Sequence, residues 1–485
     1  MKNKIKIKKN EKNEISFRFN GKEIKANEGE TIASAAYSSG IRVFSRSFKY
    51  HRPRGLFCVR GNCPNCSMRV NNTPNVRTCV TTVKEGMIVD SQNAWPSLNF
   101  DINRWIDHLS ALFPVGFQYK QFIRPRFLWP ITDKIIREIA GIGRIPPKET
   151  IDDKIDYETL TMEKEIAVIG GGISGMQSAI EASELGAQVI IIDDDDELGG
   201  YLRWGNDELY ESKKIEEDPQ RLVEELSKQI KSKEINVLNK AKVFGYFPEE
   251  DIIGIYNENK VISLKAKKII VATGAYERSR IFGNNDLPGI FLSSGIKRLI
   301  NINKVIPGKE IAIFGEESDS LLIAKELRKK GTRIKAIIIN TSVKNQFLEV
   351  KNELEKENIT IFQEAKIEKA NGDKFLKEVE VVFKNRAKKE IIKCDTLCII
   401  GELDPANEIL YQAGCKMKFS PNNKLEIERD ENMCAINNVY AAGAAAGSFG
   451  IKECIIEGRI AGRSAATPIN KKVKRKEINN QIGGA

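Results

Sequence analysis

Histidine is the scarcest of the residues that carry acid–base or metal chemistry, with two among 485 positions, His51 and His108. Neither sits in a recognisable acid–base constellation, so we expect no histidine-based catalytic centre. No run of about 18 apolar residues is present, and this excludes a membrane-spanning helix. The first residues, MKNKIKIKKNEKNE, are charged throughout and lack the apolar stretch of a signal peptide.

Cysteine is sparse and unevenly placed, because four of the nine cysteines fall between residues 58 and 79. An odd number of cysteines in a long chain without an export signal indicates a reducing compartment, so we expect a cytoplasmic protein. The net charge is +11, but lysine and glutamate alternate along most of the chain. The one basic cluster, at residues 471–476, has no nucleic-acid motif beside it, and no nucleic-acid partner is expected.

The early cysteines have the spacing C-x4-C-x2-C-x12-C, whose first part matches the plant-type [2Fe–2S] pattern. Two irons need four thiolates, and a tight loop containing glycine and proline can direct backbone N–H groups at the sulfurs. A zinc site is the alternative, but zinc prefers two C-x2-C-like pairs and only one is present. The predicted metal ligands are therefore Cys58, Cys63, Cys66 and Cys79, and the other cysteines are expected to be core residues or inert thiols.

A glycine-rich loop, Gly170-x-Gly172-x-x-Gly175, follows an apolar strand and opens a helix, and the next strand ends at Asp193. Glycines there let a pyrophosphate approach the helix N-terminus, and the aspartate can accept a ribose hydroxyl. The same carboxylate would repel a 2′-phosphate, which disfavours NADP. The predicted cofactor-binding residues are Gly170, Gly172, Ser174, Gly175, Asp193, Gly199, Gly200, Thr273, Gly274 and Gly443.

Two later segments fit a flavoprotein that binds two dinucleotides: a strand ending in Ala-Thr-Gly at residues 272–274, and a glycine-rich turn at residues 438–447. Flavin enzymes usually carry an aspartate after the glycine of that turn, whereas this chain has Ala444. FAD and NAD therefore both stay open. A second Rossmann-like unit begins at Lys309, but Glu317 and Ser320 replace two of its glycines, and we expect it to be structural.

The pattern order predicts an α/β chain with an α+β N-terminal domain. A ferredoxin-like [2Fe–2S] domain should precede a two-dinucleotide-binding, Rossmann-type flavoprotein domain. The expected divisions are 1–97 (ferredoxin-like), 98–162 (a helical, aromatic-rich linker), 163–301 with 395–470 (dinucleotide-binding), 302–394 (an inserted second Rossmann-like domain) and 471–485 (a disordered tail).

Several stretches resemble the α-subunit of heterotetrameric sarcosine oxidase and its opine oxidase, hydrogen cyanide synthase and dye-linked proline dehydrogenase relatives. They are RSFKYHRPRG (46–55), QNAWPS (92–97), VGFQYKQF (115–122), ATGAYER (272–278) and NNDLPGIF (284–291). The resemblance implies an electron-transferring subunit that pairs with an amine-oxidase-like flavoprotein β-subunit, with FMN at the interface. It also adds ATP as a third candidate for the nucleotide site. Electrons from an amino or imino acid would then pass to a downstream acceptor. A folate-binding domain, common in that family, is not expected here, and the four cysteines favour a dehydrogenase.

Two other functions stay open: a self-contained NAD(P)H-dependent acceptor reductase, and a non-catalytic scaffold with a structural nucleotide. His51 and its neighbours Lys49, Arg52 and Arg54 suit either a flavin phosphate or interface role, or a salt-bridged loop. Residues 113–129 carry six aromatic side chains. We expect this segment to be buried, with an interface near Tyr119 and Lys120.

Overall fold

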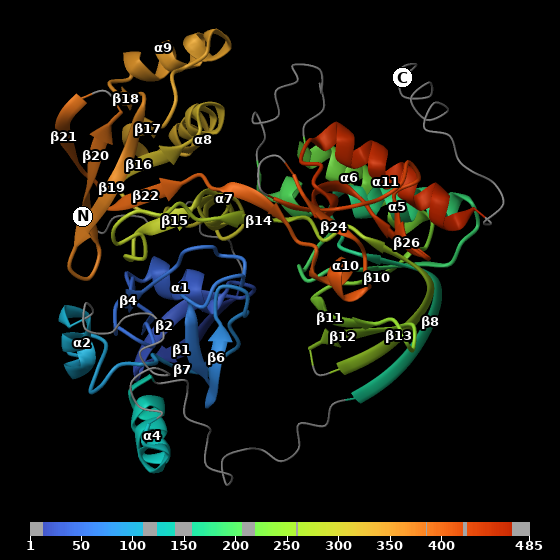
Figure 1. Cartoon of the computed structure of the whole chain (residues 1–485), viewed down its shortest axis with the longest axis horizontal. Helices are drawn as coiled ribbons and strands as arrows, with labels where there is room; N and C mark the ends of the chain where they lie inside the picture. The colour runs from blue at the N-terminus through green and yellow to red at the C-terminus, as the bar shows by residue number, and fades with distance from the viewer. Residues whose placement is uncertain are drawn as a thin grey trace. The chain divides into compact units, whose positions relative to one another are not determined.

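The computed structural model describes residues 13–109, 124–140, 158–205, 219–258, 260–384, 386–420 and 424–467 (Figure 1). The chain forms two compact units: residues 1–152 with 279–401, and residues 153–278 with 402–485. We call these unit 1 and unit 2. The predicted α/β class with an α+β N-terminal part is confirmed. The chain enters unit 1 for the second time at Ser279, so unit 1 combines the N-terminal region with the segment that contains the predicted inserted domain at 302–394.

The N-terminal part of unit 1 is a small mixed sheet covered by one helix. The alternating sequence EISFRF pairs with KEIKAN as an antiparallel hairpin, and Phe17 and Phe19 point into the core. The hydroxyl of Thr31 caps the helix that follows. The strand order is β2-β1-β7-β5-β6. The elements are β1 (Glu14–Phe19), β2 (Lys22–Asn27), α1 (Ile32–Ser38), β3 (Ser45–Arg46), β4 (Pro53–Arg54), β5 (Ser67–Val70), β6 (Thr73–Arg77), β7 (Ile88–Asp90), α2 (Trp105–His108) and α4 (Trp129–Ala140).

The second part of unit 1 is a five-stranded parallel sheet of order β15-β22-β16-β17-β18, with a three-stranded antiparallel sheet β19-β20-β21. Its central strands are apolar on both faces because helices and the smaller sheet cover them. Residues 279–301 belong to unit 1 because they supply β15 and α7. The elements are β15 (Ile290–Leu292), α7 (Ser293–Asn301), β16 (Glu310–Gly315), α8 (Glu317–Lys329), β17 (Arg333–Ile339), α9 (Leu348–Lys356), β18 (Thr360–Phe362), β19 (Ala365–Gly372), β20 (Leu376–Phe383), β21 (Arg386–Lys393) and β22 (Thr396–Ile399).

The two parts of unit 1 share one hydrophobic core. The ring of Tyr37 meets the ring of Phe291 edge-on at 5.9 Å, and its hydroxyl donates to the carbonyl of Pro307. The backbone N–H of Leu292 donates to the carbonyl of Phe57 at 3.1 Å. The cysteine loop that begins after Phe57 is therefore anchored on the end of β15.

Unit 2 is built on an eight-stranded sheet with the path β10-β9-β8-β13-β12-β11, to which β27 and β26 are added beside β13. Helix α11 packs closely on α5, because a Cβ at Gly458 or Gly462 would come within 2.4 Å of α5 carbonyl oxygens. The elements are β8 (Glu158–Ile169), α5 (Ile173–Glu184), β9 (Val189–Ile192), α6 (Pro219–Ser232), β10 (Asn236–Leu238), β11 (Ala241–Phe247), β12 (Ile252–Asn257), β13 (Lys260–Val271), β14 (Ala275–Arg278), β23 (Glu402–Pro405), α10 (Glu408–Gln412), β24 (Met417–Phe419), β25 (Leu425–Ile427), β26 (Cys434–Ile436), β27 (Val439–Ala441) and α11 (Ile451–Ala466).

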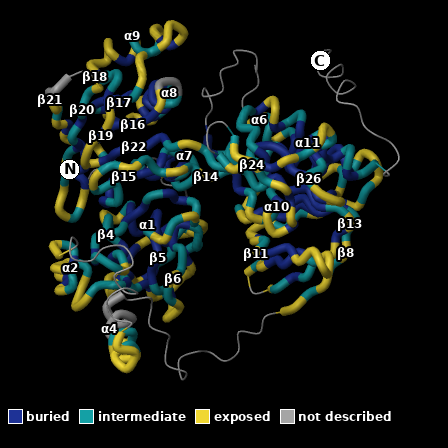
Figure 2. The backbone as a smooth tube through the Cα atoms, viewed as in Figure 1, coloured by how far each residue is buried: buried dark blue, intermediate teal, exposed yellow. Residues whose placement is uncertain are grey.

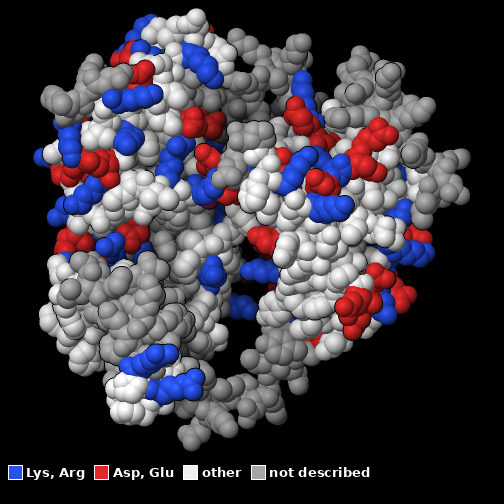
Figure 3. All heavy atoms as spheres, viewed as in Figure 1, with Lys and Arg blue, Asp and Glu red and all other residues white. Residues whose placement is uncertain are grey.

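The buried residues follow the sheets and helices, whereas charged residues of both signs are mixed on the surface. Figure 2 shows the buried residues concentrated along the strands and the inner faces of the helices. On the face drawn in Figure 3, lysine and arginine side chains lie interspersed with aspartate and glutamate side chains in each unit. Among the described helices, none has the length and apolar character needed to cross a membrane.

Candidate functional site

The cysteine loop is held in shape by its own backbone and by three side chains. Gly61 has a φ of 75°, a left-handed conformation that glycine adopts without strain. Its N–H donates to Sγ of Cys79 at 3.2 Å, so one backbone dipole points at a sulfur. The Arg77 guanidinium donates to the carbonyls of Gly61 and Cys63, and Thr78 Oγ1 donates to the carbonyl of Cys66. The loop is thus held by hydrogen bonds from its own backbone and from neighbouring side chains.

The four predicted metal ligands lie together. Cys58, Cys66 and Cys79 are buried, and Cys63 is half-buried. Hydrogen bonds from the thiols of Cys63 and Cys79 lower the pKa of Cys58 to about 2, which favours a thiolate there. A hydrogen bond from Cys79 likewise lowers the pKa of Cys66. The sulfurs therefore make contacts in the sequence Cys63–Cys58–Cys79–Cys66.

The four sulfurs form a row of pairwise hydrogen-bond contacts. Among the described residues, no group of three or more His, Cys, Asp or Glu side chains surrounds one point that a metal ion could occupy. Two linked irons need thiolates spread over a longer span than one tetrahedral zinc does. The four sulfurs and the inward-pointing N–H of Gly61 are donors of the kind that a [2Fe–2S] cluster takes.

The glycine-rich loop of unit 2 runs from the end of β8 into α5. At Gly170 the φ is 105°, and a Cβ would lie 2.3 Å from the carbonyl oxygen of Ala272. At Gly175 a Cβ would lie 1.8 Å from the carbonyl oxygen of Gly170. Gly172 differs, because a Cβ there would meet no atom within 4 Å. Two glycines thus bring the loop close to its neighbours, and the third leaves an open space at the N-terminus of α5, where a phosphate is favoured.

Asp193 follows β9 and is buried beside this loop. Its Oδ2 accepts the N–H of Gly171 at 2.5 Å, and its Oδ1 accepts the N–H of Asp195 at 2.9 Å. Burial raises the pKa of Asp193, and these two hydrogen bonds only partly offset that rise. The Gly199 N–H donates to the Gly171 carbonyl at 2.8 Å, so the turn at Gly199 and Gly200 packs directly on the loop.

The remaining predicted residues lie at the ends of neighbouring parallel strands. Thr273 and Gly274 follow β13, and Gly443 follows β27. Since β9, β8, β13 and β27 are parallel, their carboxyl ends share one edge of the sheet, where ligands of such folds bind. A Cβ at Gly443 would lie 2.2 Å from Oγ of Ser174, and that hydroxyl donates to the Cys454 carbonyl. The structure therefore brings all ten predicted cofactor-binding residues to one edge of unit 2.

Sequence reasoning missed a buried ionic network under the Gly443 turn. Glu457 of α11 is 6% exposed, and its carboxylate accepts the N–H of Gly443 at 2.8 Å. It also pairs with the Arg429 guanidinium at 2.6 Å and accepts the Ser448 hydroxyl at 2.6 Å. The turn is thus fixed from below by Glu457, while the position after Gly443 is Ala444. Only an acidic residue on an otherwise apolar helix face hinted at this role.

The second Rossmann-like region, which lies in unit 1, has a carboxylate where its strand β16 ends. Glu316 Oε1 accepts from the Arg280 guanidinium at 2.9 Å and from the Asn340 amide at 3.2 Å. Arg280 is fixed in turn by a bond to the Ile400 carbonyl at 2.8 Å. Gly315 is closely packed, since a Cβ there would lie 2.5 Å from the Ile400 side chain. An ion pair therefore stands at the strand end where a pyrophosphate would approach.

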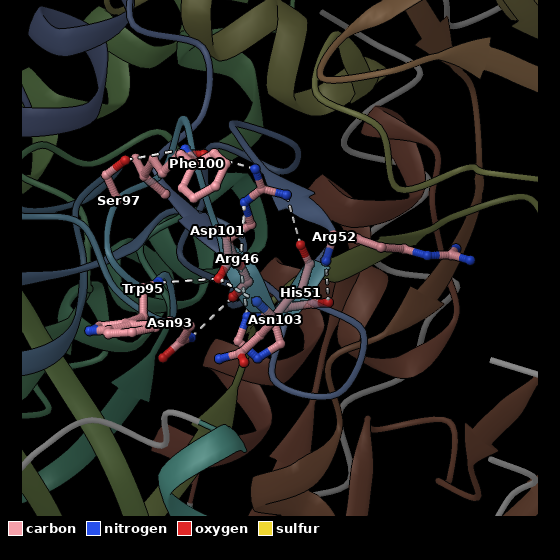
Figure 4. Close-up of polar contacts among 11 residues, drawn as sticks. Arg46, His51, Arg52, Asn93, Trp95, Ser97, Phe100, Asp101 and Asn103 are labelled. Atoms are coloured by element: carbon pink, nitrogen blue, oxygen red, sulfur yellow. Dashed lines mark hydrogen bonds and ion pairs between the residues drawn. The ribbon is translucent and has the colours of Figure 1, made fainter. Parts of the chain in front are cut away.

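His51 belongs to a buried charged cluster, drawn in Figure 4. Its Nδ1 lies 2.8 Å from Oδ2 of Asp101, and both side chains are almost fully buried. The Arg46 guanidinium donates to the carbonyls of His51 and Leu98, each at 2.8 Å. Burial raises the pKa of Asp101, but bonds from His51 and the Trp95 N–H outweigh it, and the net pKa is lowered. The cluster ties the RSFKYHRPRG segment to the strand-free segment at residues 92–103.

The neighbouring cations are also paired within unit 1. Arg52 bonds Asp107 at 2.8 Å, and Arg54 bonds Asp286 at 2.6 Å. This pairing matches the salt-bridged loop more closely than the alternative role of binding a flavin phosphate.

The predicted interface at Tyr119 and Lys120 and the predicted tail at 471–485 lie outside the described residues. The sequence predicts that the aromatic segment 113–129 is buried, but in its described part Phe127 is 73% exposed, so that expectation is wrong there.

Two family models match the chain. The "2Fe-2S iron-sulfur cluster binding domain" model matches residues 12–94, which contain the four cysteines. The "Pyridine nucleotide-disulphide oxidoreductase" model matches residues 164–467, which contain the glycine-rich loop of unit 2 and the five-stranded parallel sheet of unit 1.

Individual proteins with related chains agree with these models. The chain is 30% identical over 464 residues to "Sarcosine oxidase subunit alpha" of Rhizobium meliloti (strain 1021), covering 92% of this chain and 45% of that one. It is 24% identical over 325 residues to "Hydrogen cyanide synthase subunit HcnB" of Pseudomonas protegens (strain DSM 19095 / LMG 27888 / CFBP 6595 / CHA0), covering 61% of this chain and 69% of that one. The chain spans less than half the length of the sarcosine oxidase subunits that it matches, at 45% and 41%. The L-proline dehydrogenase from P. horikoshii shares the fold, with a TM-score of 0.70 at 19% identity over 99% of this chain and 78% of that one.

Proposed function

We propose that this chain, which belongs to the pyridine nucleotide-disulphide oxidoreductase family and is related to sarcosine oxidase α-subunits, is the electron-transferring subunit of a flavin-dependent amino or imino acid oxidoreductase complex. The observation that carries the proposal is the row of four sulfurs in a chain that also has an intact nucleotide loop. A protein that only binds a nucleotide has no need of four thiols in mutual contact.

In this proposal Cys58, Cys63, Cys66 and Cys79 hold the [2Fe–2S] cluster, which supplies one-electron transfer when bound. Burial of three of these cysteines excludes water from the sulfurs, and the half-buried Cys63 marks the side on which a partner can approach. The Gly61 N–H stabilises negative charge on the Cys79 sulfur.

The nucleotide in this proposal is an adenine dinucleotide, FAD or NAD, with its pyrophosphate over Gly172 and a ribose on Asp193. Each oxygen of Asp193 accepts one backbone N–H and keeps lone-pair capacity for a hydroxyl. The buried carboxylate disfavours a 2′-phosphate. The paired Glu316 and Arg280 in the second Rossmann-like region argue against a self-contained NAD(P)H reductase, which would need a second nucleotide there.

The amine-oxidising partner is proposed to dock on exposed aromatic residues of unit 1. Trp95 is 62% exposed, Phe100 68% and Trp105 51%. They lie in or next to the segment that the buried Arg46, His51 and Asp101 cluster fixes, so they present a preformed surface. Aromatic side chains of this kind are enriched at interface hot spots.

Co-expression with an amine-oxidase-like flavoprotein subunit tests the proposal. We expect amine-dependent dye reduction by the co-purified complex and none by either chain alone. Full activity from this chain alone would contradict the need for a partner. The Phe100→Glu variant should weaken co-purification, whereas Ile281→Glu should not, although Ile281 is 97% exposed on the same unit.

A further inference from the structure

Arg77 ends strand β6 two residues before Cys79, and its side chain reaches back over the cysteine loop. A single nitrogen, Nη1, donates to the carbonyl oxygen of Gly61 at 2.6 Å and to that of Cys63 at 2.7 Å. In the sheet Arg77 is paired with Ser67, the residue after Cys66. One side chain therefore bonds the middle of the loop, and its backbone adjoins the last two cysteines.

Among the described residues, no acidic side chain forms an ion pair with the Arg77 guanidinium. Arg52 and Arg54 of the same unit differ, since both pair with aspartates. Arg77 is also partly buried, where a charge is less screened by solvent than on the open surface. Its full positive charge thus lies against the carbonyls that carry the cysteine ligands.

We propose that Arg77 is a positioning residue that raises the reduction potential of the cluster while holding the loop in its bound shape. The inference rests on the proposed function, because it requires Cys58, Cys63, Cys66 and Cys79 to be the ligands. One-electron reduction adds one negative charge to the cluster. A nearby positive charge stabilises that reduced form more than the oxidised one, and cluster potentials depend on such charges and hydrogen bonds.

The test is an EPR-monitored redox titration of the full chain, prepared anaerobically. Arg77→Gln keeps an amide donor but removes the charge. We expect its ratio of oxidised to reduced cluster to rise at least tenfold at a fixed potential, a shift of about 59 mV to lower potential for one electron. Arg77→Lys restores the charge and should return the potential most of the way to that of the wild type.

Arg18→Gln is the matched control, because Arg18 is exposed on β1, three strands from β6 in the same sheet. It makes the same change in net charge and should leave the potential unaltered. If Arg77→Gln loses its iron, its potential cannot be measured, and the redox titration is made on Asn62→Asp instead. Asn62 is exposed between the two bonded carbonyls, and a carboxylate there should lower the potential with the loop bonds intact.

The outcomes separate the inference from the proposed function. If Arg77→Gln keeps its full iron and its potential is unchanged, the role of Arg77 is overturned and the ligand set stands. If Arg77→Gln loses its iron, an unchanged potential in Asn62→Asp has the same meaning. A wild-type chain without iron would overturn the ligand set, and the role of Arg77 with it.

Discussion

Replacing Gly172 with alanine separates nucleotide binding from folding. The added methyl group meets no protein atom, but it would occupy the space proposed for the pyrophosphate. A Cβ built there meets no heavy atom within 4 Å. Its φ of −73° and ψ of −175° are extended backbone that alanine adopts freely. Gly175 is the contrasting position, since a Cβ there would lie 1.8 Å from the Gly170 carbonyl oxygen.

The expected effects follow from these contacts. Alanine is a poorer N-cap for α5 than glycine, at a cost of about 0.5–1 kcal/mol. It also reduces the conformational entropy of the unfolded chain, a gain of about 0.4–1 kcal/mol. The free energy of unfolding should therefore change by less than about 1 kcal/mol. A methyl group in the space proposed for the pyrophosphate should weaken nucleotide binding at least tenfold, or about 1.4 kcal/mol.

Heat release of the copurified nucleotide, followed by chromatography, measures the loss of nucleotide binding. Thermal unfolding of nucleotide-free protein measures the change in stability. Gly172→Ala should keep its melting temperature and lose its nucleotide. Gly175→Ala should fail to fold or melt far lower. A Gly172→Ala protein that retains a full equivalent of nucleotide would refute the placement of the pyrophosphate over this loop.

Two further predictions concern unit 1. Cys63→Ser should abolish the visible absorption of the cluster, whereas Cys434→Ser, at a similarly half-buried thiol, should leave it intact; equal loss in both would contradict the ligand set. Asp101→Asn should lower the free energy of unfolding at pH 7 by about 3–5 kcal/mol, because it leaves the buried Arg46 guanidinium without its counter-charge and removes the carboxylate that bonds Nδ1 of His51. Since the folded pKa of Asp101 is lowered, its stabilisation is present above the unfolded pKa and is lost as pH falls through the folded one. The difference between Asp101→Asn and wild type in denaturant titrations should therefore shrink below about pH 4, and a pH-independent difference would contradict this reasoning.

The features that local sequence patterns predict are those with short-range causes. The cysteine spacing predicts a loop, and the structure brings the four sulfurs together. The glycine spacing predicts a strand, a turn and a helix, and Gly170 and Gly175 are found where a side chain would clash. In both motifs the decisive contacts lie within a few residues or between adjacent strands.

Contacts between distant segments were not predictable in the same way. Glu457 bonds Gly443 because α11 turns back under the strand end, and nothing in its sequence neighbours indicates that geometry. The pairing of His51 with Asp101 joins residues 50 positions apart, and neither residue lies in a strand. The change of unit at Ser279 depends on β15 pairing with β22, more than 100 residues later in the chain. Each of these depends on tertiary packing, which periodicity and spacing do not encode.

The central claim is that four cysteines of unit 1 hold a [2Fe–2S] cluster through which this subunit transfers electrons. Iron analysis and EPR of the anaerobically purified wild-type chain test it most directly. The account predicts about two irons per chain and an S = 1/2 signal that appears on reduction with dithionite. About one zinc per chain, without iron and without an EPR signal, would contradict it.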